Sequence, residues 1–245
     1  MAVRRRAPGR AGTRQSVGRR IVHGLLLAAG AFIALTILLV LPLRWVPPFT
    51  SSFMVQNWFG QQSLSANVDF QWVPRRRISR QAPLAVMAAE DQKFMDHDGF
   101  DLDAIGKAWQ RNRHGGRIRG GSTISQQVAK NLWLWPGRSW LRKGLEAWFT
   151  LWLEWCLPKE RILELYLNIA QFGPTVFGVE AAARQYFHRS AATLNASQAA
   201  RLAAVLPNPV AYRAGRPSGY VIARQRWIER QARNLGDELP QRRWP

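Results

Sequence analysis

Residues 90–168 carry four polar blocks. They read EDQKFMDHDG (90–99), GGSTISQQVAKN (120–131), RKGLE (142–146) and KERILELYLN (159–168). Carboxylates serve acid–base catalysis, a glycine-rich loop that enters a helix holds anions, and Lys and Arg neutralise phosphate. Together the blocks predict sugar transfer from a phosphorylated donor.

Apolar positions recur at helical spacing beyond residue 80, between recognisable start and stop signals. Pro83 begins the first expected helix, Asp101 caps the second, and Ser122 or Thr123 caps the third. The expected ranges are 83–95, 101–115, 122–133, 139–157, a helix from Pro158 that stops before Gly173, then 179–187, 197–206 and 219–235. No convincing alternating strand appears, so we expect a mainly α domain.

Residues 21–43 are almost wholly apolar, and about 20 such residues span a bilayer as a helix. A cleaved signal peptide is the alternative, but the run is long and lacks a clear small-residue cleavage site. Seven arginines precede it: Arg4, Arg5, Arg6, Arg10, Arg14, Arg19 and Arg20. This charge bias predicts a cytoplasmic N-terminus and an outward-facing remainder.

The chain divides into a basic tail (1–20), a transmembrane helix (21–43), a connector (44–80), one folded domain (81–235) and a short tail (236–245). Its 245 residues carry a formal net charge of +20, which predicts an anionic partner. Nucleic acid, anionic lipid and pyrophosphate all qualify, and the membrane segment favours the last two. The single Cys156 excludes an intramolecular disulfide and is expected to be a buried structural thiol.

The four blocks, in their order, closely resemble the signatures of glycosyltransferase family 51, the peptidoglycan glycosyltransferases that polymerise lipid II. Those signatures read roughly ED-x2-F-x2-H-x-G, G-x-STxxQQ-x2-KN, RK-x2-E and K-x2-ILE-x-YLN. The resemblance covers about residues 80–235 and implies a lysozyme-like fold. It points to the monofunctional branch, held in the bacterial inner membrane with its catalytic domain in the periplasm.

By this resemblance Glu90 and Glu146 are the catalytic pair, although sequence spacing alone does not place them in one cleft. Glu90 is expected to be the general base on the acceptor's 4-hydroxyl, which attacks C1 of the growing strand and releases undecaprenyl pyrophosphate. It follows an apolar run, residues 86–89, and partial desolvation there raises the pKa of a carboxyl group.

Substrate binding is expected from Ser122, Thr123, Gln126, Gln127, Lys130, Asn131, Arg138, Arg142 and Lys143. The structural alternatives to substrate binding are simple helix capping for the second block and a solvated ion pair for the third. The resemblance also implies Mg or Mn at the donor pyrophosphate, held jointly by substrate and Glu146, and no organic cofactor. The sequence has no dedicated metal cage.

For several further side chains we expect a supporting role in the structure and no direct part in catalysis. Asp91 is expected to orient a partner or cap a turn, and Phe94 and His97 to shape the cleft. Glu164, Tyr166 and Asn168 are expected to support the site, and Gln171 stands where relatives often have an acid. Leu141, Leu145, Trp148, Trp152 and Trp155 follow one helical face, which we interpret as a core stripe with a membrane-dipping surface as the alternative. The connector aromatics Trp45, Phe49, Phe53, Trp58 and Phe59 suit either headgroup contact or packing.

Two other functions compete with a polymerase that acts on lipid II and the growing glycan strand at the membrane. A lytic lysozyme-like hydrolase would share the catalytic glutamate but needs no clamp for pyrophosphate. A non-catalytic membrane scaffold or nucleic-acid-binding protein would make Glu90 dispensable. No Ser-x-x-Lys or Lys-Thr-Gly occurs, so we expect cross-linking from another protein and partnership with transpeptidases or division proteins, without nucleic acid.

Overall fold

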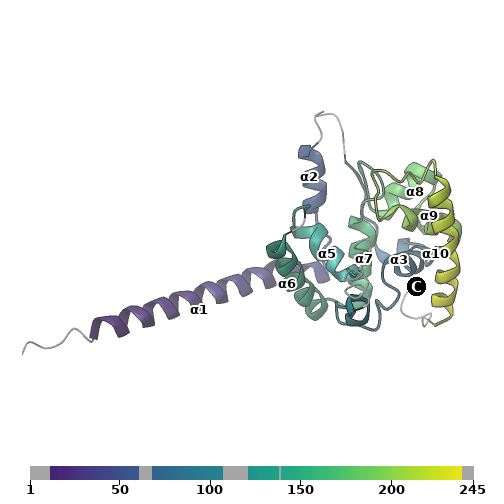
Figure 1. Cartoon of the computed structure of the whole chain (residues 1–245). Helices are drawn as coiled ribbons and strands as arrows, with labels where there is room; N and C mark the ends of the chain where they lie inside the picture. The colour runs from purple at the N-terminus through teal and green to yellow at the C-terminus, as the bar shows by residue number, and fades with distance from the viewer. Residues whose placement is uncertain (1–11, 61–67, 107–120, 138, 239–245) are drawn as a thin grey trace, which may run out of the picture. The chain divides into compact units, whose positions relative to one another are not determined.

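The computed structural model describes residues 12–60, 68–106, 121–137 and 139–238. The elements, in chain order, are α1 (Gly12–Val40), η1 (Leu41–Arg44), α2 (Ser52–Gly60), β1 (Asp69–Phe70), η2 (Arg75–Arg77), α3 (Gln81–Glu90), α5 (Ile124–Trp133), α6 (Trp140–Cys156), α7 (Lys159–Ile169), β2 (Val176–Phe177), α8 (Val179–Phe187), η3 (Ala191–Thr193), α9 (Ala196–Val205) and α10 (Gly219–Glu238) (Figure 1). The chain forms two compact units, which divide between Leu39 and Val40.

The first unit consists of α1, a long helix whose apolar side chains face outward. Leu25, Leu26 and Leu38 are each about two-thirds exposed, at 65%, 65% and 70%. The segment Val17–Arg44 has a mean hydropathy of 2.7 in its most apolar window and is long enough to cross a membrane. The helix therefore fits the single-pass anchor that the sequence predicts.

The second unit is mainly α, as predicted, and its helices form two packed groups. Helix α3 packs against α9 and α10, whereas α5 packs against α6 and α7 (Figure 1). Residues 82–88 of α3 are all buried, which explains why that helix is apolar on every side. Contacts between α3 and α7 join the two groups, and a hydrogen bond from Gln127 to Glu90 ties the C-terminal end of α3 to α5.

A short parallel pairing of β1 with β2 ties the connector to the domain, with Asp69 opposite Val176. Asn168 holds the connector a second time, because its side chain both donates to and accepts from the backbone of Val73. The connector therefore belongs to the folded unit. It contains α2, a helix that the sequence did not predict.

Side-chain caps fix the helix starts that position the second and third blocks. Thr123 caps α5 in a capping box with Gln126, and Ser139 caps α6 by accepting from the backbone N–H of Arg142. Both starts agree with the predicted ones. Helix α3 differs, because it ends at Glu90 instead of continuing to Met95. Glu90 is consequently the last residue of a buried helix, beside a turn.

Candidate active site

Glu90 lies where α3 meets α5 and α10. Its Oε2 accepts a hydrogen bond of 3.0 Å from Nε2 of Gln127 on α5. Nη2 of Arg224 on α10 lies 3.7 Å from the other oxygen, Oε1. Burial raises the pKa of Glu90, while Gln127, Arg224 and Lys130 oppose this rise. Desolvation dominates, and the carboxyl group is thus suited to exchange a proton.

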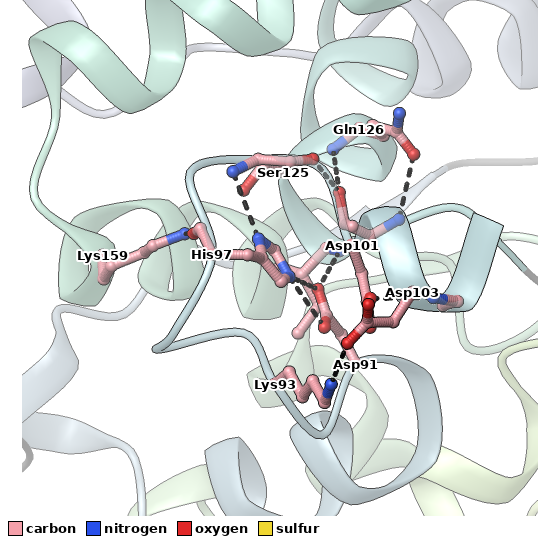
Figure 2. Close-up of polar contacts among 12 residues, drawn as sticks. Asp91, Lys93, His97, Asp101, Asp103, Ser125, Gln126 and Lys159 are labelled. Atoms are coloured by element: carbon pink, nitrogen blue, oxygen red, sulfur yellow. Dashed lines mark hydrogen bonds and ion pairs between the residues drawn. The ribbon is translucent and has the colours of Figure 1, made fainter. Parts of the chain in front are cut away.

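Asp91, the next residue, is buried and fixes the turn after α3 to the start of α5. Its Oδ2 accepts from the backbone N–H of Ile124 at 3.0 Å, and Nε2 of His97 lies 3.0 Å from Oδ1 (Figure 2). Nδ1 of His97 accepts from the backbone N–H of Gly99, so Nε2 carries the proton that Asp91 accepts. Asp91 thus orients His97, one of the two roles predicted for it, and also binds the first backbone N–H of α5.

Gly99 closes the same turn against α6. Its φ of +86° lies in the left-handed region, and an added Cβ would stand 2.7 Å from Cγ2 of Thr150. The carbonyl of Gly99 accepts a hydrogen bond of 2.7 Å from the Thr123 hydroxyl. The glycine of the first block therefore permits the close contact that joins this turn to α5 and α6.

Glu146 lies inside α6 with a nearly buried side chain, and two cations contact its carboxylate. Arg142 Nη1 lies 2.7 Å from Oε2, and the Lys143 ammonium donates to Oε1. The Arg142 side chain is only 12% exposed, whereas that of Lys143 is 42% exposed. Glu146 thus holds one buried and one accessible cation side by side, one helical turn back along α6.

Lys130 on α5 interacts electrostatically with both glutamates. Burial lowers the pKa of its ammonium group, and both Glu146 and Glu90 act against that lowering. Its Nζ lies 5.3 Å from the ring centroid of Phe53. Among the described residues no hydrogen-bond acceptor contacts this ammonium group. The donors of Lys130 are therefore not used by any described acceptor, and its charge acts on both Glu90 and Glu146.

The site holds more hydrogen-bond donors than the described protein acceptors satisfy. Nε of Arg142 and Nε of Arg224 are both buried without a hydrogen-bond partner in the described part of the chain. With Lys130, they place unsatisfied donors near each carboxylate. Such an excess of donors suits an anionic ligand.

The family model described as Transglycosylase matches residues 57–233. The chain belongs to the transglycosylase family. Proteins named biosynthetic peptidoglycan transglycosylase are 52% identical in Xanthomonas axonopodis pv. citri, over 89% of this chain and 90% of that protein, and 52% identical in Pectobacterium carotovorum, over 94% of each. One from Pseudomonas syringae is 51% identical over 94% of this chain and 99% of its own length.

This transglycosylase is therefore an enzyme, a peptidoglycan glycosyltransferase. That confirms the family and the reaction class that the four sequence blocks predict. The non-catalytic scaffold and the nucleic-acid-binding protein were alternatives to this class, and membership of the family excludes them as descriptions of the whole chain.

Only some of the predicted site residues come together in the structure. Glu90, Gln127, Lys130, Arg142, Lys143 and Glu146 form the site described above. The side chains of Thr123 and Gln126 form the capping box of α5 and are buried. Asn131 is also buried, Ser122 is exposed, and Arg138 lies outside the described residues.

Two parts of the site were not predicted from the sequence. Arg224 reaches Glu90 from the last helix, and no motif marks it because its spacing on α10 resembles that of any amphipathic arginine. Glu154 accepts from Ser125 and lies 2.8 Å from Nζ of Lys159, which also donates to the carbonyl of His97. Lys159, from the fourth block, thereby ties α7 to the Asp91 turn.

Glu146 does not fit the predicted role of a metal ligand. Both of its oxygens already accept from cationic side chains, and Lys130 adds a third positive charge nearby. The described residues contain no group of three or more His, Cys, Asp or Glu side chains that could hold a metal ion. A divalent cation prefers several oxygen ligands, whereas the groups that contact Glu146 are themselves cations.

The interpretation of the α6 stripe as core is wrong for its two end residues. Leu141 is 70% exposed and Trp155 is 78% exposed, whereas Leu145, Trp148 and Trp152 are partly buried. The face of α6 that enters the core consists of Glu146, Phe149, Thr150 and Leu153. Helix α6 is therefore apolar on an outer face as well as an inner one.

Proposed function

We propose that this enzyme polymerises lipid II into β-1,4-linked glycan strands and releases undecaprenyl pyrophosphate, with Glu90 as the general base. The acceptor's 4-hydroxyl oxygen attacks C1 of the donor sugar, and its proton passes to Glu90. The bond between C1 and the pyrophosphate oxygen breaks, and the pyrophosphate leaves with the electron pair. Membership of the family and the position of Glu90 support this reaction.

The observation that carries the proposal is that the buried carboxyl group of Glu90 and the Arg142–Lys143 cation pair at Glu146 belong to one site, in which the charge of Lys130 acts on both glutamates. A proton must be accepted at one end of the reaction, and negative charge must be stabilised at the other. Glu90 supplies the base, and Lys130, Arg142 and Lys143 supply cations for the pyrophosphate. Hydrolysis of a neutral glycosidic bond would require the glutamate but not this cation cluster.

Glu146 is proposed to position the cations and not to exchange protons itself. Its two oxygens hold Arg142 and Lys143, which keeps their charges close to Lys130 despite the mutual repulsion of the three cations. Mg or Mn at the pyrophosphate remains a prediction, and no step of the mechanism depends on it.

We also propose that the outer face of α6 rests on the membrane surface that holds the substrate. Trp140, Leu141, Leu151 and Trp155 are exposed on α6, at 94%, 70%, 55% and 78%. Arg44 donates to the carbonyl of Cys156 at 2.8 Å, so the segment leaving the anchor contacts the end of this helix. The exposed Trp45 follows directly, and apolar rings beside a basic residue suit the headgroup layer.

The anchor and the arginine-rich tail support insertion in the bacterial inner membrane with a cytoplasmic N-terminus and a periplasmic domain. Partnership with transpeptidases or division proteins remains a prediction, because no described residue identifies such a partner.

The test incubates the full-length chain in detergent with labelled lipid II and resolves the products on a gel. We expect polymer ladders that muramidase digests, and none from Glu90→Gln. Glu160→Gln, which changes a glutamate on α7 outside the site, is the matched control and should polymerise normally. Release of muropeptides from preformed cell wall, without polymer, would support the lytic alternative; an active Glu90→Gln would remove Glu90 from the base role.

A further inference from the structure

Behind Glu90 lies a chain of two hydrogen bonds that crosses three helices. The hydroxyl of Tyr166 on α7 lies 3.1 Å from Oε1 of Gln127 on α5. Nε2 of the same amide donates to Oε2 of Glu90 on α3 at 3.0 Å. Tyr166 is fully buried, with 1% of its surface exposed. Among the described residues, the hydrogen bonds that link the phenol to Glu90 run through the Gln127 amide.

The donors and acceptors of Tyr166, Gln127 and Glu90 determine the direction of these two hydrogen bonds. A buried hydroxyl needs an acceptor, and in the described part of the chain Gln127 Oε1 is the partner of the Tyr166 hydroxyl. Burial and the nearby carboxylates raise the pKa of Tyr166 well above its usual value, so the phenol keeps its proton. The amide oxygen must then face Tyr166, and the amide nitrogen must face Glu90.

The reversed amide would be unfavourable while Glu90 is ionised. It would leave the Tyr166 hydroxyl without an acceptor and place the amide oxygen against a carboxylate oxygen. Protonation of Glu90 would relieve the second problem, because the carboxylic acid could donate to the amide. The orientation of Gln127 is therefore linked to the protonation state of Glu90.

We infer that Tyr166 is a positioning residue, which sets the orientation of the Gln127 amide and thereby holds Glu90 in the ionised form that accepts the acceptor's proton. This inference rests on the proposed role of Glu90 as the base. It assigns the tyrosine of the fourth block a part in catalysis that acts through Gln127 and involves no contact with substrate.

Other charged groups face Glu90 from each neighbouring helix. Arg224 on α10 and Lys130 on α5 favour the ionised form, whereas Asp91 on the following turn opposes it. None of these contacts involves the Tyr166 hydroxyl. Removing that hydroxyl therefore changes the amide while leaving the surrounding charges in place.

The experiment measures the rate of lipid II polymerisation by the full-length chain against pH for wild type and Tyr166→Phe. Without the phenol the reversed amide no longer leaves a buried hydroxyl without an acceptor, so it becomes available to protonated Glu90 as an acceptor of the carboxyl proton. The protonated form is then favoured more than in wild type, and the pKa of Glu90 rises further. The acidic limb of the profile should move to higher pH, with about a tenfold loss of rate on that limb and a smaller loss on the plateau. Tyr186→Phe is the matched control, since that hydroxyl lies 3.3 Å from the carbonyl of Phe172.

A second variant separates positioning from a merely structural role. Gln127→Ala should move the acidic limb in the same direction, and adding Tyr166→Phe to it should move the limb no further. Equal loss of rate at every pH in Tyr166→Phe, or additive shifts in the double variant, would overturn the inference. If Tyr166→Phe does not fold, the inference is tested by Gln127→Ala alone. An acidic limb of Gln127→Ala that stays at the wild-type pH would also overturn the inference.

The two proposals fail in different ways. A fully active Glu90→Gln would show that Glu90 is not the base and would refute the proposed mechanism. An inactive Glu90→Gln beside an unshifted Tyr166→Phe profile would refute the positioning role alone.

Discussion

Arg224 Nη2 lies 3.7 Å from Oε1 of Glu90, so the last helix of the domain contributes a charge to the residue at the end of its first buried helix. The same Nη2 donates to the carbonyl of Ala89 at 3.3 Å, which fixes the guanidinium beside the end of α3. Helix α10 therefore closes the fold and also influences the ionisation of the proposed base.

Arg224→Gln should move the acidic limb of the polymerisation profile to higher pH. The guanidinium lowers the pKa of Glu90, so its loss leaves desolvation less opposed and the carboxyl group holds its proton to higher pH. At pH values on the acidic limb, the rate of Arg224→Gln should be about tenfold lower than that of wild type. Initial rates measured from acidic to neutral pH check this.

Arg226→Gln is the control for this change, because Arg226 is an exposed arginine on the same helix. Its profile should match that of wild type. An unmoved limb in Arg224→Gln would show that the 3.7 Å contact does not act on Glu90.

Glu146→Gln should reduce both stability and polymerisation. The neutral amide leaves the buried Arg142 without a counter-charge, which should cost about 2 kcal/mol of unfolding free energy. Denaturant unfolding and lipid II polymerisation by the same preparation measure the two effects. Glu164→Gln provides the comparison, since Glu164 pairs with Arg161 at 2.9 Å and also accepts from the backbone N–H of Arg75.

Glu164→Gln should lose similar stability but retain polymerisation at temperatures where it is folded. Equal loss of activity in both variants would mean that Glu146 acts only through stability.

Gly99→Ala should destabilise the domain by about 2–4 kcal/mol, because an alanine there is strained at a φ of +86° and collides with Thr150. Gly144→Ala should instead stabilise α6 by about 0.5–1 kcal/mol, since a Cβ at that helical position meets nothing within 4 Å. Thermal unfolding of both variants checks the contrast. A neutral Gly99→Ala would show that the turn accommodates a side chain.

Replacing the exposed apolar residues of α6 should weaken polymerisation in membranes more than in detergent. Leu151→Ser with Trp155→Ser removes two side chains that are more than half exposed, so we expect little change in stability. The rate on lipid II in vesicles should fall several-fold, and the rate in detergent should stay near that of wild type. Equal rates in vesicles would argue against a membrane role for this face.

Changing Glu146 should leave the metal dependence of the enzyme unaltered. Because Arg142 and Lys143 occupy its oxygens, Glu146→Gln should need the same Mn concentration for half of its own maximal rate as wild type. Titration of chelator-treated enzyme with Mn measures this. A requirement raised about tenfold would restore Glu146 as a metal ligand.

The mainly α class, the apolar anchor and the starts of α5 and α6 could be predicted from the sequence alone. These features depend on local physics: helical periodicity, a run of apolar residues long enough for a bilayer, and capping side chains such as Thr123 and Ser139. The four blocks also identified the family, because their residue types recur at fixed spacing.

Which side chains meet depends on how the helices pack. Arg224 reaches Glu90 from a helix distant in sequence and lies in no pattern that distinguishes a site residue from an ordinary helix residue. Tyr166 lies in the fourth block and was expected to support the site, but its hydrogen bond to Gln127 follows from the packing of α7 against α5. Gln126 and Gln127 are neighbours with the same chemistry, yet one caps α5 and the other binds Glu90. Successive helical residues point about 100° apart, so packing against α3 and α7 decided their separate roles.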